Sequence, residues 1–377
     1  MTGHRAEEKY AKLRKPIFIS GLIAMLVIGL YSPWRSVPIP YDIEDFTSGA
    51  YFERLDEHIR SVLPYQENLR RINLQTGLIS GQSMQNDIFI SQSGLIRNIS
   101  AKVPLRVQDD IDAVIQFSTL IDRPTYLMLI PTASAILQQH LPQYAGIYLN
   151  QRRFIDDTSV AVWRYVTPIN VYPTLFNRRE EYIFYRTQDN LTALGGYYVY
   201  QTLASRLGIQ AANISTRDMY DISYPIHSFY GDLFRLSPYS VVRPDSVMVF
   251  RHRRQGGHIV THINGDDVKI YHTLFPTHLA ALGREMDIFF GGVSAITRVS
   301  SSQPGRSILI FGDQTAKAYL PFLTANYSNI TLVDLSQLTP ENFGDVSVEN
   351  YNQILFAFSV DTFGSGTLRL ENAARLM

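Results

Sequence analysis

The chain has 377 residues, 45% of them apolar, and its 34 Lys and Arg residues balance 34 Asp and Glu residues. This composition excludes general disorder, and the length allows at most about two domains. Zero net charge argues against nucleic acid as a partner, because binding to a phosphate backbone needs a strongly basic surface. The lack of cysteine excludes disulfides, thiol nucleophiles and thiolate metal sites.

The N-terminal segment is typical of a membrane anchor. Residues 16–34 (PIFISGLIAMLVIGLYSPW) carry no charge and are long enough to cross a bilayer core. A basic segment precedes them, which predicts a cytoplasmic N-terminus and an extracytoplasmic remainder. A cleaved signal peptide and a buried core helix are the alternatives. We favour an uncleaved anchor because the run is apolar on all faces and is followed by bulky residues where a cleavage site would need small ones.

The chain therefore divides into four predicted parts. These are a cytoplasmic tail (1–15), a transmembrane anchor (16–34), an extended linker (35–47) and an extracytoplasmic domain (48–377). The predicted location is the cell membrane, with a single pass. The domain begins with a helical pattern from Ser48 to about Gly77, which Pro64 interrupts.

Strands and helices then alternate along the domain. The predicted elements are a hairpin (87–96), a helix (107–122), a strand (126–130), a helix (135–141), an antiparallel meander (245–272), a strand (307–311), a helix (315–325) and two strands (330–335 and 353–358). Strand, turn and helix in this order favour parallel pairing with crossover helices. We predict a doubly wound α/β sheet with an antiparallel insertion, behind the single transmembrane helix.

The turn at Gly312-Asp313-Gln314 is the first place to look for chemistry, because open α/β sheets bind ligands at the carboxyl ends of their strands. A strand that turns directly into a helix presents one side chain and free backbone N–H groups together. Here that side chain belongs to Gln314, which a neighbouring base cannot activate. Thr315 is expected to cap the following helix.

These residues belong to an ordered set that resembles a known family. The set resembles the SGNH-hydrolase-like proteins of alginate O-acetylation (AlgJ/AlgX-type, or DHHW family) from Tyr51 to the C-terminus. Its segments, in family order, are SVLPYQEN (61–68), NDIFISQSGLI (86–96), LMLIPTASAILQQHLP (127–142), YRTQDNLTALGGYYVYQTLA (185–204), SFYGDLF (228–234), PDSVMVF (244–250), DIFFGGVSAITRV (287–299) and SILIFGDQT (307–315).

The residues that carry the family's chemistry are different in this chain. The resemblance implies a serine after Gly-Asp and an aspartate and histidines in the DHHW segment, as nucleophile, orienting group and base. The corresponding residues here are Gln314 for serine, Gln188 for aspartate, Asp189 and Asn190 for the histidines, and Leu191 for tryptophan. In the family's Gly-Gly-Asn loop, Val293 replaces the asparagine that can donate to an oxyanion.

The scaffold residues of the motifs are retained. Asp313 still follows the strand, and Thr192 and Gly195 stand at the motif's threonine and glycine positions. Loss of the nucleophile or the base alone costs about a million-fold in a serine enzyme, so we expect a pseudoenzyme without catalytic residues. The resemblance implies a non-catalytic role in polysaccharide assembly or O-acetylation, with a membrane-bound O-acyltransferase or glycan as partner. The alternative is an active acetylesterase or O-acetyltransferase that uses non-standard residues.

No other motif predicts a metal, a cofactor or a second catalytic set. His258 and His262 lie four residues apart in a predicted strand, but no third ligand stands at a telling spacing, so we interpret the histidines as solvated surface residues. The pair Glu180-Glu181 and the pair Asp109-Asp110 fit helix starts and solvated faces. Gly256-Gly257 reads as a hairpin turn rather than a phosphate-binding loop. Tyr197, Tyr200 and Leu203 follow helical spacing, which favours core packing over sugar stacking.

Overall fold

The computed structural model describes residues 84–91, 93–142, 145–214, 219–239, 242–253, 257–301 and 305–376. The predicted tail, anchor, linker and early helices (1–83) lie outside these ranges. Within the described ranges, no helix is both long and apolar enough to span a bilayer. All described residues belong to one compact unit, residues 74–377.

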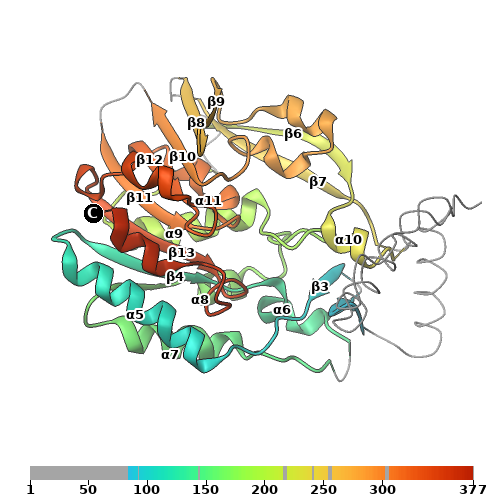
Figure 1. Cartoon of the computed structure of the whole chain (residues 1–377). Coiled ribbons are helices and arrows are strands. Elements are labelled where there is room, and N and C mark those ends of the chain that lie inside the picture. Colours follow the sequence, from blue (N-terminus) through green and yellow to red (C-terminus); the bar gives the residue numbers. More distant parts are fainter. Residues whose placement is uncertain are drawn as a thin grey trace, which may run out of the picture. The chain divides into compact units, whose positions relative to one another are not determined.

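An eight-stranded sheet forms the centre of this unit (Figure 1). The strands follow the order β5-β4-β13-β11-β12-β10-β8-β9. Their bounds are β4 Thr125–Ile130, β5 Thr167–Asn170, β8 His258–Asn264, β9 Asp267–Tyr271, β10 Ile296–Ser301, β11 Arg306–Gly312, β12 Tyr327–Val333 and β13 Gln353–Ser359. The first five in spatial order pair in parallel, as predicted.

The central parallel strands are buried on both faces, which is why they read as continuous apolar runs. Every residue of β13 is buried, and Ile308 to Gly312 of β11 are buried as well. On one face, Phe117 packs edge-on against Phe311 of β11 and Phe356 of β13, with ring centroids 5.3 and 5.2 Å apart. The helix that carries Phe117 is α5 (Pro104–Leu120), and Figure 1 shows it beside α7 (Gln151–Val162).

The antiparallel part of the sheet differs from the predicted meander (245–272). Strands β8 and β9 do extend the sheet, through β10. However, β7 (Asp245–His252) leaves it and pairs with β6 (Tyr220–Phe229) in a separate two-stranded ribbon. Sequence reasoning placed β7 with β8 because they are neighbours in the chain. In the structure Ile222 of β6 stands opposite Phe250 of β7 and Ile226 opposite Val247, and Phe250 also packs against Tyr220 and Phe322.

A third, small sheet confirms the predicted hairpin near residue 90. It contains β1 (Met84–Gln85), β2 (Ile88–Ile90) and β3 (Leu95–Arg97), all antiparallel. The α-helices are α5 Pro104–Leu120, α6 Ala133–Ile136, α7 Gln151–Val162, α8 Tyr172–Asn177, α9 Ala193–Leu207, α10 Asp232–Leu236 and α11 Ala316–Leu323. The 3-10 helices are η2 Gln138–His140, η3 Thr277–Leu282, η4 Glu285–Ile288, η5 Pro340–Asp345, η6 Val348–Asn350 and η7 Leu370–Leu376.

The predicted helix at 135–141 is shorter than expected. Helix α6 ends at Ile136, Leu137 leaves helical geometry, and η2 follows. Pro142 gives the physical reason, because a proline disfavours the helical conformation of the residue before it, and Leu141 is indeed extended. The predicted helices at 107–122 and 315–325 are confirmed as α5 and α11.

The chain adds strands toward one edge of the sheet after β4 and toward the opposite edge after β11. After β4 it continues to β5 on one side, and after β11 it continues to β12 on the other, with β13 in the gap. Such a reversal leaves the carboxyl ends of β4, β13 and β11 uncovered by crossover connections, and this is where open α/β sheets place ligands.

Candidate functional site

The turn after β11 is fixed by Asp313. One carboxylate oxygen of Asp313 accepts hydrogen bonds from the backbone N–H of Thr315 at 2.9 Å and the hydroxyl of Thr315 at 2.5 Å. The other accepts from the N–H of Ser359, the last residue of β13, at 2.8 Å and from the hydroxyl of Thr362, just after β13, at 2.6 Å. The retained aspartate therefore ties together the carboxyl ends of two neighbouring strands.

The hydroxyl of Thr315 does not cap α11, contrary to the sequence prediction. Thr315 stands at the N-cap position, but its hydroxyl donates to the carboxylate of Asp313. A hydrogen bond to a charged carboxylate is stronger than a neutral capping hydrogen bond. Gln314, at the family's nucleophile position, is exposed, and its side chain has no hydrogen-bond partner among the described residues. The turn thus keeps its geometry and presents an amide.

The Gly291-Gly292-Val293 loop lies against the first turn of α11. Lys317 of α11 forms an ion pair with Asp287 at 2.8 Å, and Arg284 holds the same carboxylate at 2.8 Å. Burial alone would raise the pKa of Asp287, but Lys317 and Arg284 together hold it below its ordinary value. A side chain on Gly292 would meet Asp287 at 2.9 Å, and Val293 packs against the hydrophobic core. The loop therefore carries no side-chain donor where the family has asparagine.

The segment that corresponds to the DHHW motif is held by a buried aspartate. Asp245, at the start of β7, is fully buried and accepts hydrogen bonds from the N–H groups of Arg186 and Thr187, each at 2.8 Å. It also accepts from the hydroxyls of Thr187, at 2.5 Å, and Tyr182. Burial and the neighbouring carboxylate raise the pKa of Tyr182, so its phenol stays a donor.

The retained threonine and glycine of the motif are structural. The hydroxyl of Thr192 donates to the carbonyl of Tyr182 at 2.7 Å and accepts from the N–H of Gly195 at 3.2 Å, which caps α9. A Cβ on Gly195 would lie 2.3 Å from the carbonyl oxygen of Ile183. These residues keep the segment 182–192 folded back on itself whether or not it carries catalytic groups.

Gln188, which the motifs assign to the position of the family's aspartate, forms two hydrogen bonds with Asp232. Its amide oxygen accepts from the N–H of Asp232 at 2.8 Å, and its amide nitrogen donates to the Asp232 carboxylate at 3.2 Å. An aspartate at position 188 would face Asp232 carboxylate to carboxylate, and like charges at this distance repel. The amide of Gln188 is therefore compatible with Asp232 where a carboxylate would not be.

Asp189, at the first histidine position, forms an ion pair with Arg97 of β3 at 2.7 Å. The two side chains are 20% and 35% exposed. Burial raises the pKa of Asp189, Arg97 opposes this, and Asp361 after β13 adds to the rise. Lys102 donates to the backbone carbonyl of Asp361, and burial lowers the pKa of Lys102. Charged side chains from β3, the segment 185–192 and the end of β13 thus lie close together.

Helices α9 and α11 bring the two halves of this site to one corner. A Cβ on Gly196, in the first turn of α9, would lie 1.9 Å from the carbonyl oxygen of Ala318, in the first turn of α11. The helices touch backbone to backbone, so their N-terminal ends lie together. Gln188, Asp189 and Asn190 precede one of them and Gln314 the other. Asn190 is partly exposed, and its carbonyl accepts from the N–H of Tyr185 at 3.1 Å.

Sequence reasoning was wrong about His262. Its side chain is 5% exposed, and its ring contacts the hydroxyl of Ser294 at 3.0 Å and the carbonyl of Phe290 at 2.7 Å. The reason is that β8 is an interior strand, between β10 and β9, and His262 points under the 290–294 loop. Burial lowers the pKa of His262, which is therefore a neutral ring that fixes this loop. In the described part of the chain, no group of three or more metal-ligating side chains converges.

No sequence pattern pointed to Arg97, Lys102, Asp287 or Lys317. The contacts of Arg97 with Asp189, of Lys102 with Asp361 and of Lys317 with Asp287 each join residues that are far apart in the chain. Only the arrangement of the turns at the sheet edge brings them to the site.

Comparison with known proteins identifies the family. The family model described as DHHW protein matches residues 107–333, so the chain belongs to the DHHW family. This confirms the resemblance read from the sequence. No match to a curated protein sequence was found.

Two of the solved structures found by comparison share the fold, those of the Eubacterium siraeum protein and of Bacillus cereus PatB1. A DHHW family protein from Eubacterium siraeum is 19% identical, with 78% of this chain and 96% of that chain covered and a TM-score of 0.61. Bacillus cereus PatB1, solved with a sulfonyl adduct, is 16% identical, with 77% and 99% covered and a TM-score of 0.57. The O-acetyltransferase domain of Pseudomonas putida AlgJ is 10% identical, with 77% and 98% covered and a TM-score of 0.46.

Proposed function

We propose that this chain is a non-catalytic DHHW-family protein of a cell-surface polysaccharide assembly or O-acetylation system. The observation that carries the proposal is the corner formed by the ends of α9 and α11. The positions that the motifs assign to the family's orienting aspartate, second histidine and serine hold Gln188, Asn190 and Gln314, none of which can supply or remove a proton at neutral pH. Asp189, at the first histidine position, is held in an ion pair with Arg97. Family membership and the ordered motifs supply the polysaccharide context.

The surroundings of the corner support a binding role. Gln188 donates a hydrogen bond to Asp232, and Thr315 donates one to Asp313. Asp189 forms an ion pair with Arg97. These contacts are formed by the residues that differ from the family pattern as well as by those retained. We therefore propose that the scaffold serves recognition, with glycan or a membrane-bound O-acyltransferase as its partner. We also propose that residues 16–34 anchor it in the cell membrane with the domain on the extracytoplasmic side.

An exposed tyrosine, stacked on a partly buried phenylalanine, favours glycan as a ligand. The rings of Tyr230 and Phe234 stack with centroids 4.1 Å apart, and Tyr230 is 41% exposed. Gly231, between them, donates to the hydroxyl of Thr187 at 2.9 Å, so the pair is fixed to the motif segment. Tyrosine combines an apolar ring face with a polar hydroxyl, a combination suited to stacking on a sugar and hydrogen bonding to it.

The catalytic part of the proposal is tested with a chromogenic acetyl ester and the full-length protein. We expect the natural protein to give no saturable turnover above the buffer rate. The comparison variant combines Gln314→Ser with Asn190→His, and a second adds Gln188→Asp together with Asp232→Asn so that no two carboxylates face each other. Natural turnover that is lost in Asp189→Asn or Lys317→Met would contradict the proposal and support the alternative, an acetylesterase or O-acetyltransferase with non-standard residues.

The glycan part is tested by affinity electrophoresis in gels that contain bacterial exopolysaccharides, with and without acetyl groups. We expect at least one glycan to retard the protein, and Tyr230→Ala to weaken the apparent affinity about two- to tenfold, the range expected for loss of one stacking ring. Tyr224→Ala is the matched control, because Tyr224 is 49% exposed on β6 and has no stacking partner among the described residues. Equal losses in both variants would count against the aromatic pair.

A further inference from the structure

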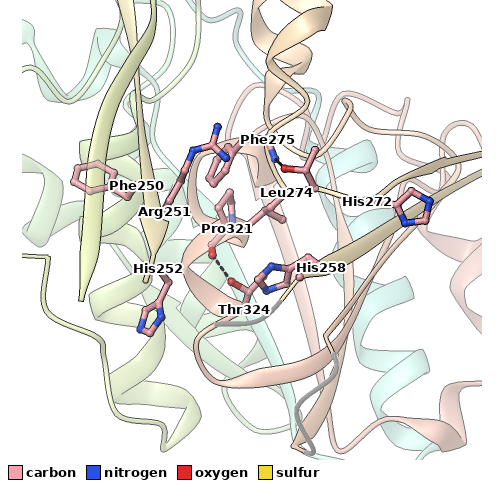
Figure 2. Close-up of a pocket in the computed structure, with 11 residues that line it drawn as sticks. Phe250, Arg251, His252, His258, His272, Leu274, Phe275, Pro321 and Thr324 are labelled. Carbon is pink, nitrogen blue, oxygen red and sulfur yellow. Dashed lines mark hydrogen bonds between the residues drawn. The ribbon is translucent and has the colours of Figure 1, made fainter. Parts of the chain in front are cut away.

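A pocket lies at the far end of α11 from Gln314. Its volume is about 230 Å³, and residues from β7, the start of β8, the segment after β9 and the end of α11 line it (Figure 2). Helix α11 begins beside the corner described above and ends at Leu323, so its length of about 12 Å separates the two places. The pocket is smaller than the roughly 300–1,000 Å³ of a drug-sized site, which limits it to a small molecule.

Apolar side chains form much of the pocket wall. They are Phe250 of β7, Leu274 and Phe275 after β9, and Pro321 of α11, all buried. The hydroxyl of Thr324 donates to the carbonyl of Pro321 at 2.7 Å and is visible at the pocket edge in Figure 2. A wall of this kind suits an apolar or ring-shaped part of a ligand.

The ionisable side chains of the lining are one arginine and three histidines. They are Arg251 and His252 of β7, His258 of β8 and His272 after β9; the α11 residues that line it, Pro321 and Thr324, are uncharged. No aspartate or glutamate is among these lining residues. The Arg251 guanidinium lies 5.2 Å from the Phe275 ring centroid and has no ion-pair partner in the described part of the chain. An electropositive pocket with apolar walls concentrates anions.

His258 presents an unused hydrogen-bonding atom. Its Nε2 is buried and has no partner among the described residues, although a buried polar atom without a partner is costly. Burial, and then the neighbouring His252, lower the pKa of His258. The ring nitrogen is therefore available to donate to a ligand, and a bound negative charge would favour its protonated form. A metal is not indicated, because no three ligating side chains converge in the described ranges.

We propose that this pocket binds a small organic anion. The carboxylate or phosphate group lies against Arg251 and Nε2 of His258, and the apolar remainder lies against Leu274, Phe275 and Pro321. The inference is independent of the proposed function of the DHHW corner, because no residue is shared between the two places.

Isothermal titration calorimetry of the full-length protein tests the proposal, with benzoate and phenyl phosphate as probes and neutral benzamide as the ligand control. We expect at least one of the two anions to bind saturably, and benzamide to bind at least tenfold more weakly. Arg251→Gln is expected to weaken anion binding about tenfold. Arg253→Gln is the matched control, because Arg253 pairs with Asp221 and does not line the pocket.

Two variants of His258 make the test specific. His258→Leu is expected to weaken anion binding about tenfold, while His258→Gln keeps an N–H donor and should recover part of the affinity. Natural affinity should rise as the pH falls through the pKa of bound His258, and His258→Gln should lose this dependence. Equal binding of benzamide, an equal loss in Arg253→Gln, or no saturable binding of either anion would overturn the proposal. Thermal unfolding of each variant confirms that it is folded.

Discussion

Replacing Asp245 by alanine is expected to lower the free energy of unfolding by about 3–5 kcal/mol, the range seen when one partner of a buried charged network is removed. The carboxylate is fully buried and accepts hydrogen bonds from two backbone N–H groups and two hydroxyls. Without it, the N–H groups of Arg186 and Thr187 are left buried and unpaired. Urea unfolding followed by circular dichroism measures the change.

Asp267→Ala is the control for this prediction. Asp267 forms an ion pair with Lys269 at 2.9 Å, but both side chains are more than half exposed, so the expected change is within about 0.5 kcal/mol. A loss of under about 1 kcal/mol in Asp245→Ala would show that water replaces the carboxylate, and that the motif segment does not depend on it.

The role of Asp245 could not be predicted from the sequence. It stands at the start of a β-pattern, where an aspartate usually marks a solvated turn, and the groups that it binds lie nearly sixty residues earlier in the chain. The same limit applies to Arg97 and Asp189, which are 92 positions apart. Periodicity reports which face a residue occupies within its own element, and says nothing about the partner element that covers it.

The central sheet was predictable for the opposite reason. Strands β4, β11 and β13 are buried on both faces, so their sequences are nearly uniformly apolar and short, and each is followed by turn residues. The pairing of β7 was not predictable, because an alternating apolar strand fits β6 or β8 equally well by pattern. Tertiary contacts, including those of Phe250 with Tyr220 and Phe322, decide between them.

The correspondence of the degenerate site with the family's motifs remains a prediction from the sequence, and the sequence offered no reason for the residue types found there. The ordered motifs assigned Gln188 and Gln314 to the family's aspartate and serine positions. Only the structure shows that Gln188 both accepts from and donates to Asp232, so that restoring the family's aspartate would place two carboxylates together. A residue that differs from the pattern of a family can therefore belong to a different hydrogen-bond network.

Gly196→Ala is expected to lower the free energy of unfolding by about 3 kcal/mol, at the upper end of the usual overpacking range. In an ordinary helix this change stabilises by up to about 1 kcal/mol. Here the new methyl would lie 1.9 Å from the carbonyl oxygen and 2.3 Å from the carbonyl carbon of Ala318, and neither backbone atom can rotate away. Either α9 or α11 must move, and the contact that brings Gln188 and Gln314 to one corner opens.

Hydrogen exchange locates the damage, and Gly146→Ala provides the control. We expect amides of α11 to exchange faster in Gly196→Ala at temperatures where the protein is still folded. A Cβ on Gly146 meets no atom within 4 Å, so Gly146→Ala should change neither stability nor exchange in α11. If Gly196→Ala were neutral in both measurements, the two helices would not be in direct backbone contact, and the proposed corner would lose its main structural support.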